Sequence, residues 1–531
     1  MHVPFNLGLV GAASLAMVLA ACGSGGGGGT GIDTNAPGTA EFAAKVDGCQ
    51  AGDRPETALQ GQVPAALRAS GFGGFNCNLS LVGQLPGEGG NWSSATYKSD
   101  RQHCAYYATA TPIAGRVNPG VPVIDISNAA SPAFRTSLTT PAMVDPWESL
   151  RVHHGRRLLI ADNGQNGGGG PEVDVYDIAN DCQSPQLLAS VPVGTGVDGG
   201  ITIPAGGPIG HEGNISPDGL TYYIGDIRKA AYHAVDITNP ARPKLIATYN
   251  ILDTGLRAGT TVHGLSVSND GNRLYAVILG GPGFTGAPAV VPQNQVNNGF
   301  AIFDTSEVQQ RRPNAQIKLL SAALYQDGSV AQHTIPMRVG GKQFLVQVDE
   351  GGSAGLADAA RAQLACSSGL APFPMARIYD ISDEKNPVAV SKLRLETHDI
   401  KNCGQVLPDI AGLSVFTYGS HYCSVDNRDN ATALACSYFN SGVRVFDIRN
   451  PARPKEIAYF NPPSAPSRPG SSHVRFNQWR AGGPDWCASR LDFDFANQRL
   501  TTMCQDNGLL VMKFAAGTWP FPQSEPSTSQ N

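Results

Sequence analysis

A short apolar segment that ends in an aspartate recurs along this chain, and this repetition constrains the fold more than any other feature. Copies such as Val121–Asn128 and Tyr232–Asn239 continue into a polar turn. The aspartates of the clear copies are Asp125, Asp177, Asp236, Asp304, Asp380 and Asp447. A seventh, degenerate copy, Leu509–Phe514, carries a lysine at that position. One such unit cannot bury its apolar face alone, so seven copies predict seven packed units.

Each unit has the pattern of four β-strands. A proline and a short apolar run such as Lys244–Tyr249 follow each aspartate, which indicates a turn and then an outer strand. Upstream, Asp218-Gly219 and Asp270-Gly271 join two further alternating segments, a strong hairpin signal. The segments between the copies lack a sustained helical period, which excludes an α/β solenoid. The sequence therefore predicts an all-β fold, a single seven-bladed β-propeller of four-stranded antiparallel blades over residues 78–516.

The last copy lacks an outer strand of its own, because a poor strand sequence follows Phe514. The segment Leu79–Leu85 resembles the outer strands of other copies and precedes the first complete one. We expect this N-terminal strand to complete the last blade and close the ring, which removes an exposed sheet edge.

The N-terminus indicates export. The apolar stretch Phe5–Ala21 is too short for a comfortable membrane span and is typical of a signal peptide. It ends in Leu19-Ala-Ala-Cys22, which resembles the bacterial lipobox and implies lipid attachment to Cys22. The alternative is an ordinary signal peptide that ends near a cysteine. The expected order is a signal peptide at 1–21, the lipidated cysteine and a glycine-rich tether at 22–48, an N-terminal extension at 49–77 and a disordered tail at 517–531.

The other ten cysteines are an even number, which suits disulfides in an oxidising compartment. Three pairs lie close in the predicted blades, two of them around hairpin turns. These pairs are Cys423 with Cys436, Cys487 with Cys504 and Cys366 with Cys403. The pairing of Cys49, Cys77, Cys104 and Cys182 stays open, and free structural thiols are the alternative for every pair.

Four histidines occupy one position of the repeat, a few residues before the turn of the inner hairpin. They are His211, His263, His333 and His421. In a propeller this position starts the innermost strand beside the central channel, and imidazole is a common metal ligand. The pattern predicts one transition-metal ion, zinc, copper or iron, with Glu148 and Glu212 as further ligands or as acceptors for the ring NH groups. The alternative is that each histidine hydrogen-bonds the backbone of the neighbouring blade.

The Asp-Ile-x-Asn-Pro-Ala-Arg-Pro pattern of Val235–Pro243 and Phe446–Pro454 resembles the LVIVD-repeat family. That resemblance implies an extracytoplasmic propeller and assigns no activity. A weaker likeness, at Tyr379–Asp383, is to the selenium-binding protein and methanethiol oxidase family. The Cys-x-x-Cys pair of that family is missing here, so its activity does not transfer.

Composition and motifs narrow the function. A formal net charge of −5 with scattered basic residues gives no footprint for nucleic acid. The sequence has no nucleophile elbow, phosphate loop or HExxH motif. We expect a lipoprotein anchored at the bacterial cell envelope, on the outer membrane, that binds or scaffolds an envelope protein, peptide or glycan. The alternatives are a metal-dependent oxidoreductase or hydrolase with a His-lined channel site, and a purely structural envelope component.

Overall fold

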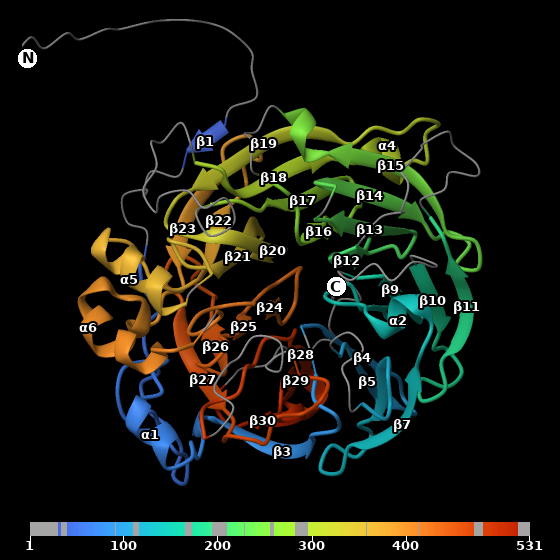
Figure 1. Cartoon of the computed structure of the whole chain (residues 1–531). Coiled ribbons are helices and arrows are strands. Elements are labelled where there is room, and N and C mark those ends of the chain that lie inside the picture. Colours follow the sequence, from blue (N-terminus) through green and yellow to red (C-terminus); the bar gives the residue numbers. More distant parts are fainter. Residues whose placement is uncertain are drawn as a thin grey trace, which may run out of the picture.

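Seven four-stranded sheets form a closed ring around a central channel in the computed structural model of the chain (Figure 1). The structure describes residues 30–32, 40–90, 92–109, 116–164, 173–193, 210–227, 229–254, 260–281, 296–356, 358–413, 415–471 and 482–518. The fold is the seven-bladed β-propeller that the repeats predict. Within the described residues, no helix is both long and apolar enough to cross a bilayer.

Within each blade the strands run from the innermost to the outermost. Blade 1 has β4 (Ser94–Lys98), β5 (His103–Tyr107), β6 (Val121–Asp125) and β7 (Ala133–Leu138). Blade 2 has β8 (Arg151–His153), β9 (Leu158–Asp162), β10 (Val173–Asp177) and β11 (Gln186–Val191). Blade 3 has β12 (Glu212–Ile215), β13 (Thr221–Asp226), β14 (Ala231–Asp236) and β15 (Lys244–Asn250). Blade 4 has β16 (Leu265–Val267), β17 (Arg273–Ile278), β18 (Asn298–Asp304) and β19 (Lys318–Tyr325).

The remaining three blades follow the same plan. Blade 5 has β20 (Ser329–Val339), β21 (Lys342–Gly351), β22 (Ala376–Asp380) and β23 (Val388–Lys392). Blade 6 has β24 (Cys423–Val425), β25 (Ala433–Ser437), β26 (Val443–Asp447) and β27 (Lys455–Asn461). Blade 7 has β28 (Asp492–Asp494), β29 (Arg499–Cys504), β30 (Gly508–Phe514) and, as its outer strand, β3 (Leu79–Leu85).

The recurring aspartate makes the turn between the third and fourth strands. In blades 1 to 6 its Oδ1 accepts a hydrogen bond from the backbone N–H two residues later, at 2.7–3.0 Å. This contact is an Asx turn, which reverses the chain without a glycine. In all six of these blades the pairing of the third strand with the fourth contains a register shift, which bends the outer strand.

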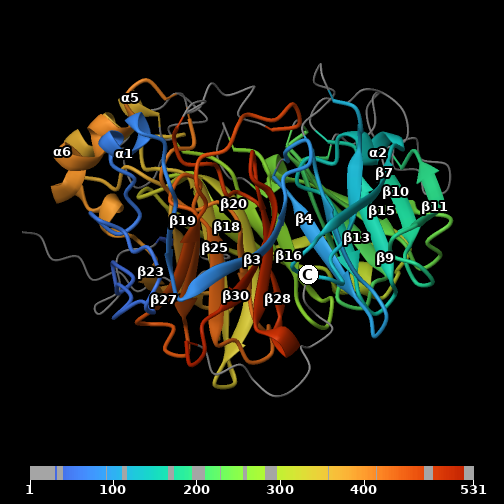
Figure 2. The ribbon, with the colours of Figure 1, turned by 90° about the horizontal axis from the view of Figure 1, so that it is seen from below.

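The ring closes through the two ends of the propeller, as the sequence predicts. Strand β3 pairs antiparallel with β30, from Leu79 opposite Phe514 to Leu85 opposite Leu509. Figure 2 shows β3 lying along β30 at the side of the ring. Apolar side chains fill the space between adjacent blades, such as Val175 of blade 2 with Ile224 of blade 3.

The helices of the described residues are short and lie in the connections between strands or in the N-terminal segment. They are α1 (Ala65–Ala69), α2 (Pro141–Val144), α4 (Ser306–Gln309), α5 (Ala359–Ser367) and α6 (Cys403–Val406). Single 3₁₀ turns cover Ile251–Thr254, Glu396–His398, Ile400–Asn402, Leu407–Ile410 and Phe495–Asn497. Helices α1, α5 and α6 gather on one side of the ring in both views (Figures 1 and 2).

The N-terminal segment adds strands to two blades. The short strand β1 (Thr30–Ile32) pairs parallel with β19, and β2 (Phe75–Cys77) pairs antiparallel with β27. Between them, Ala40 and Ala44 form isolated bridges to blades 5 and 6. The extension therefore covers part of the outer edge of the ring.

The structure contains five disulfides. Three are the pairs expected from the sequence, Cys366–Cys403, Cys423–Cys436 and Cys487–Cys504. The sequence did not decide how the other four cysteines pair. They form Cys49–Cys77 and Cys104–Cys182. So many disulfides are typical of a protein that folds in an oxidising compartment, which indicates export.

Candidate metal centre

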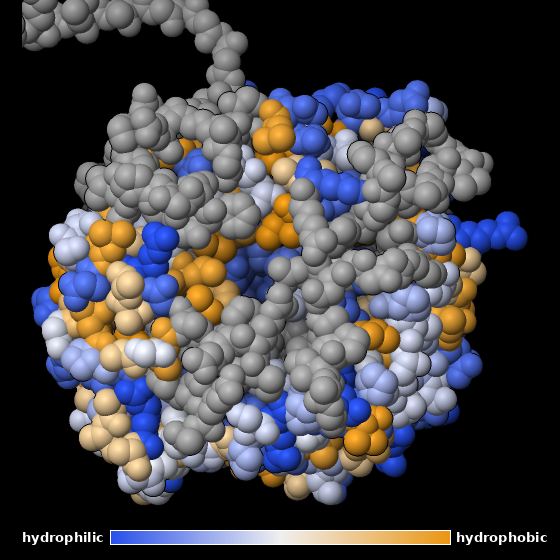
Figure 3. Space-filling model, in the orientation of Figure 1, coloured by the Kyte–Doolittle hydropathy of each residue, from blue (hydrophilic) through white to orange (hydrophobic). Residues whose placement is uncertain are grey.

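The four histidines at the repeated position start the innermost strands of four consecutive blades. His211 directly precedes β12, His263 and His421 lie two residues before β16 and β24, and His333 lies within β20. All four side chains are buried. In Figure 3 the channel mouth is a hollow with hydrophilic residues inside it.

Three of these histidines gather around two glutamates. One group comprises Glu148, His211 and His263, and a second comprises Glu148, Glu350 and His421. Within each group, one ligand atom per residue lies within 4.8 Å of the others. The two groups share Glu148, so the five side chains form one continuous cluster.

Backbone carbonyls of the next blade fix the rings of His263 and His421. His263 Nδ1 lies 3.0 Å from the carbonyl oxygen of Gln332, and His421 Nδ1 lies 2.6 Å from that of Ala488. Carbonyl oxygens only accept, so Nδ1 donates in both rings. Each Nε2 faces the glutamates and makes no hydrogen bond with any described residue. Metal-binding histidines show this arrangement, with one nitrogen bound to a carbonyl and the other directed at the ion.

The distances between Nε2 atoms and carboxylate oxygens suit ligands of a metal. His421 Nε2 lies 3.2 Å from both Glu148 Oε1 and Glu350 Oε2. His263 Nε2 lies 3.5 Å from Glu148 Oε2 and 3.6 Å from Glu350 Oε1. With bonds of about 2.1 Å, atoms at these separations subtend angles of about 100–120° at a shared ion. These separations between imidazole and carboxylate atoms therefore match those between neighbouring ligands of a metal ion.

The glutamates create a strongly negative environment at the two rings. Burial lowers the pKa of His263 and His421, but the nearby carboxylates outweigh it and raise the values to about 9 and about 10. Burial would raise the pKa of Glu148, yet His263 and His421 hold it at about 2. The cluster thus stabilises positive charge among these side chains.

His211 completes the cluster as a neutral ring. Its Nε2 lies 3.6 Å from Glu148 Oε2 and accepts a hydrogen bond from Trp147 Nε1 at 3.2 Å. Burial, together with the charge on His263, lowers the pKa of His211 to about 3. The Trp147 hydrogen bond occupies the one lone pair of this neutral ring, so His211 binds a metal only in exchange for that bond.

His333 departs from the four-histidine arrangement predicted from the sequence. A register shift between Ala331 and His333 places a bulge in β20. Gln332 then faces the cluster, where its Nε2 donates to Glu148 Oε2 at 3.3 Å. His333 instead accepts from the backbone N–H of Cys423 at 3.3 Å, and burial lowers its pKa well below the usual value. One extra residue in a strand reverses which side chains face a given side. The bulge therefore directs Gln332 to the cluster and turns His333 away from it.

Two segments of the chain match a known family model. The LVIVD-repeat model matches residues 116–140 and 222–251, which cover the third and fourth strands of blades 1 and 3. The chain is a seven-bladed β-propeller that carries LVIVD repeats in two of its blades. None of the curated proteins matches its sequence.

Solved structures resemble this LVIVD-repeat protein at low identity. A Bacteroides uniformis protein described as a candidate 6-phosphogluconolactonase is 12% identical, with 77% of this chain and 92% of that chain covered and a TM-score of 0.47. The Pseudomonas aeruginosa periplasmic gluconolactonase is 12% identical, with coverage of 78% and 93% and a TM-score of 0.45. Kuenenia stuttgartiensis hydrazine synthase is 11% identical, with coverage of 82% and 96% and a TM-score of 0.44. Such distant similarities carry no argument about activity.

The glutamates of the LVIVD-repeat propeller have separate roles. Glu148, which the sequence suggested as an accessory residue, lies at the centre of the cluster. Glu212 lies beside it, with Oε2 3.6 Å from His263 Nδ1 and Oε1 accepting from Arg151 and Arg490 at 3.0 and 2.7 Å. Sequence reasoning missed Glu350, which lies near the end of the buried strand β21. Its signal was the pair of acidic residues Asp349 and Glu350 at the end of the mostly apolar segment Phe344–Val348.

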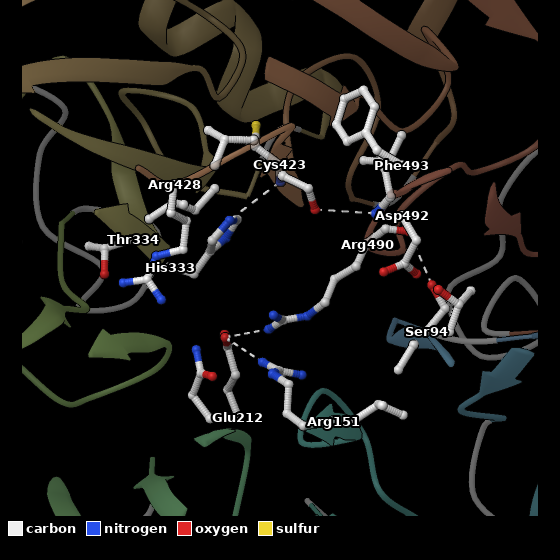
Figure 4. A pocket seen from close by; sticks show the side chains of 18 of the residues that line it. Ser94, Arg151, Glu212, His333, Thr334, Cys423, Arg428, Arg490, Asp492 and Phe493 are labelled. Atoms are coloured by element: carbon white, nitrogen blue, oxygen red, sulfur yellow. Dashed lines mark hydrogen bonds and ion pairs between the residues drawn. The ribbon is translucent and has the colours of Figure 1, made fainter. Parts of the chain in front are cut away.

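The channel of the LVIVD-repeat propeller also contains a basic cavity next to the cluster. It has a volume of about 80 Å³ and is lined in part by Arg151, Arg428, Arg490, Glu212, His333 and Asp492. Figure 4 shows Arg151 and Arg490 converging on Glu212 from blades 2 and 7. Burial raises the pKa of Asp492 to about 7. The repeat pattern gave no signal for these arginines, because each occurs in a single blade.

Proposed function

We propose that this LVIVD-repeat propeller is an exported metalloprotein that binds a transition-metal ion in its central channel. The observation that carries the proposal is the pair of imidazole Nε2 atoms of His263 and His421. They are buried, have no hydrogen bond with the described residues, and face two carboxylates at 3.2–3.6 Å. Buried carboxylates need a positive partner, and a metal ion that displaces the Nε2 protons would bind both rings and both carboxylates.

The donor set narrows the metal. Imidazoles and carboxylates together suit zinc and iron(II), and mixed sets of this kind occur in non-haem iron sites. Thiolate ligands are not present at this site, and all ten described cysteines are in disulfides. We propose iron(II) or zinc, with copper as a weaker fit to the carboxylates. The bound ion would act as a Lewis acid, which makes a metal-dependent hydrolase or oxidoreductase the matching class of enzyme.

Elemental analysis tests this proposal. Protein isolated without a polyhistidine tag or chelators should contain stoichiometric zinc or iron, and His263→Ala and His421→Ala should each lose most of it. The matched control is His233→Ala, because His233 is equally buried and bonds Thr248 through Nδ1, but its Nε2 faces one carboxylate, that of Asp226 at 3.4 Å, and belongs to neither ligand group. Metal-free wild type that also fails to take up added metal, or equal metal in all variants, would reject the metal centre.

The N-terminus supports attachment of this propeller to a membrane. Cys22 and most of the glycine-rich tether lie outside the described residues, so the argument rests on the Leu19–Cys22 motif and the tether composition. We propose lipid attachment at Cys22 and a location at the bacterial cell envelope, on the outer membrane. Several acyl chains give a stable anchor without a transmembrane helix.

The basic cavity favours a second candidate function, the binding of an acidic group of an envelope protein, peptide or glycan. Arg151 and Arg490 each have an Nε without a hydrogen bond to the described residues, although both donate elsewhere to Glu212. Arginine forks bind carboxylates and sulfates well. Glucuronate and sulfate titrated by calorimetry should bind wild type but not Arg490→Gln. Arg273→Gln is the control, because Arg273 does not line this cavity and pairs with Glu384; equal binding by both variants would reject this function.

A further inference from the structure

We infer that the channel cluster holds two metal ions, bridged by the carboxylates of Glu148 and Glu350. The inference rests on the proposed metal centre and goes beyond it in the number and arrangement of the ions. It follows from how the four carboxylate oxygens are distributed between His263 and His421.

Each glutamate presents its two oxygens to different histidines. Glu148 directs Oε1 to His421 Nε2 at 3.2 Å and Oε2 to His263 Nε2 at 3.5 Å. Glu350 directs Oε2 to His421 Nε2 at 3.2 Å and Oε1 to His263 Nε2 at 3.6 Å. A carboxylate that binds one ion needs only one of its two oxygens near the other ligands of that ion. Two carboxylates that both span the same pair of histidines are instead placed to bridge two ions.

One ion is too small to collect all five side chains. Ligands with bonds of about 2.1 Å lie at most about 4.2 Å apart across one ion. The cluster divides into two groups of three, each compact within 4.8 Å, with Glu148 as the shared member. His211 and His263 belong to the first group, and Glu350 and His421 to the second. Neither group contains all five residues, so one ion cannot bind them all.

The assignment gives each ion a plausible set of ligands. The first ion takes His263, one oxygen of Glu148 and one of Glu350, and it takes His211 in exchange for the hydrogen bond from Trp147. The second takes His421 and the remaining two oxygens. Two ions in such centres lie about 3.5–4 Å apart, the span of a bridging carboxylate. The second ion has fewer protein ligands, so its open positions would receive solvent or substrate.

Charge identifies the class of ligand that would complete the centre. Two divalent ions carry four positive charges, whereas Glu148 and Glu350 supply two negative ones. The neighbouring Glu212 is already paired with Arg151 and Arg490. An anionic ligand with a carboxylate or phosphate group would balance the excess by binding between the ions, as substrates do in two-metal hydrolytic sites.

Reconstitution with manganese(II) tests the number of ions. Protein stripped of metal and dialysed against excess Mn²⁺ should retain two ions per chain by elemental analysis. Its electron paramagnetic resonance spectrum should show spin coupling between close ions. Glu350→Gln should retain about one ion per chain, because neutral glutamine cannot bridge, and its spectrum should lose the coupling. Glu384→Gln is the control: Glu384 accepts from Arg273 and belongs to neither ligand group, so two coupled ions should remain.

The outcomes separate this inference from the proposed metal centre. One uncoupled ion per chain in saturated wild type would overturn the two-ion arrangement and leave the metal centre intact. No retained ion would overturn both. The wild-type spectrum decides the question even if a variant fails to fold, since the coupling requires two ions close together in one chain.

Discussion

His263 donates its Nδ1 proton to the backbone carbonyl oxygen of Gln332 in the next blade, at 3.0 Å. A hydrogen bond to the neighbouring blade was the simpler interpretation of the repeated histidines, and it exists here and at His421. It leaves Nε2 of both rings directed at Glu148 and Glu350. The structural contact and the metal-binding arrangement are therefore compatible, because the first orients the ring for the second.

Metal binding should stabilise the fold. An ion that binds only the folded chain adds about 2.7 kcal/mol to the free energy of unfolding at a concentration of 100 times its Kd. We expect zinc or iron(II) to raise the melting temperature of chelator-treated protein and excess chelator to reverse the rise. His421→Ala should lose the rise, whereas His233→Ala should keep it. Equal rises in both variants would place the binding elsewhere.

The repeat made the fold predictable because its signals are local. Asp236 and the turn it makes, or Asp218-Gly219 and its hairpin, specify strand boundaries within a few residues. Repeated seven times, such local signals define a closed ring. The outer strand of the last blade was also predictable. Leu79–Leu85 has the pattern of an outer strand and precedes the first complete blade, so it was free to join the last one.

The site was predictable only where it followed the repeat. His211, His263 and His421 share a repeat position and do gather. His333 shares that position too, but the bulge at Gln332 turns it away, and counting residues from a turn does not reveal a bulge. Glu350 lies in the second strand of its blade, and the position of Arg490 is not an arginine in the other repeats. Their positions follow from how the blades converge, which no single repeat encodes.

Closure of the ring should make a large contribution to stability. Leu79 in β3 is 1% exposed and packs against blade 7, whereas Leu81, two residues later, is 41% exposed. Leu79→Ala should lower the free energy of unfolding by about 2–4 kcal/mol because it leaves a cavity. Leu81→Ala should have little effect. Urea unfolding measures both, and equal small losses would show that the strand contributes little to closure.

The Cys423–Cys436 disulfide links the two inner strands next to His421. Replacing both cysteines by serine should lower the free energy of unfolding by roughly 3 kcal/mol, given the short loop that the bond closes. Guanidinium unfolding measures the loss. A non-reducing peptide map of wild type should show the linkage, and its absence would remove the basis for the expected loss.

Lipid attachment should depend on one residue. Cys22→Ser should give protein that is released in soluble form or stays unprocessed, because serine cannot receive the thioether-linked lipid. Membrane fractionation and intact-mass analysis measure the two results. Wild-type partitioning of the variant into membranes would reject the lipobox interpretation.

Asp162 should make stability fall as the pH rises. This residue at the end of β9 is 1% exposed, and its Oδ2 accepts from Tyr222 Oη at 2.8 Å. Burial raises its pKa from 3.8 to about 8; Tyr222 and Arg151 oppose the rise, and the charges of Asp226 and Glu212 add to it. The folded state thus holds a proton that the unfolded state releases above pH 3.8.

The stabilisation from that proton is complete below pH 3.8 and is lost as the pH rises through about 8. Within this window the loss is about 1.4 kcal/mol per pH unit. Asp162→Asn keeps the shape and an acceptor for Tyr222 but cannot ionise. Its free energy of unfolding relative to wild type, from urea titrations at pH 5, 6 and 7, should therefore increase by about that amount at each step. A difference that stays constant with pH would show that the Asp162 proton is held no more tightly in the folded chain than in the unfolded one.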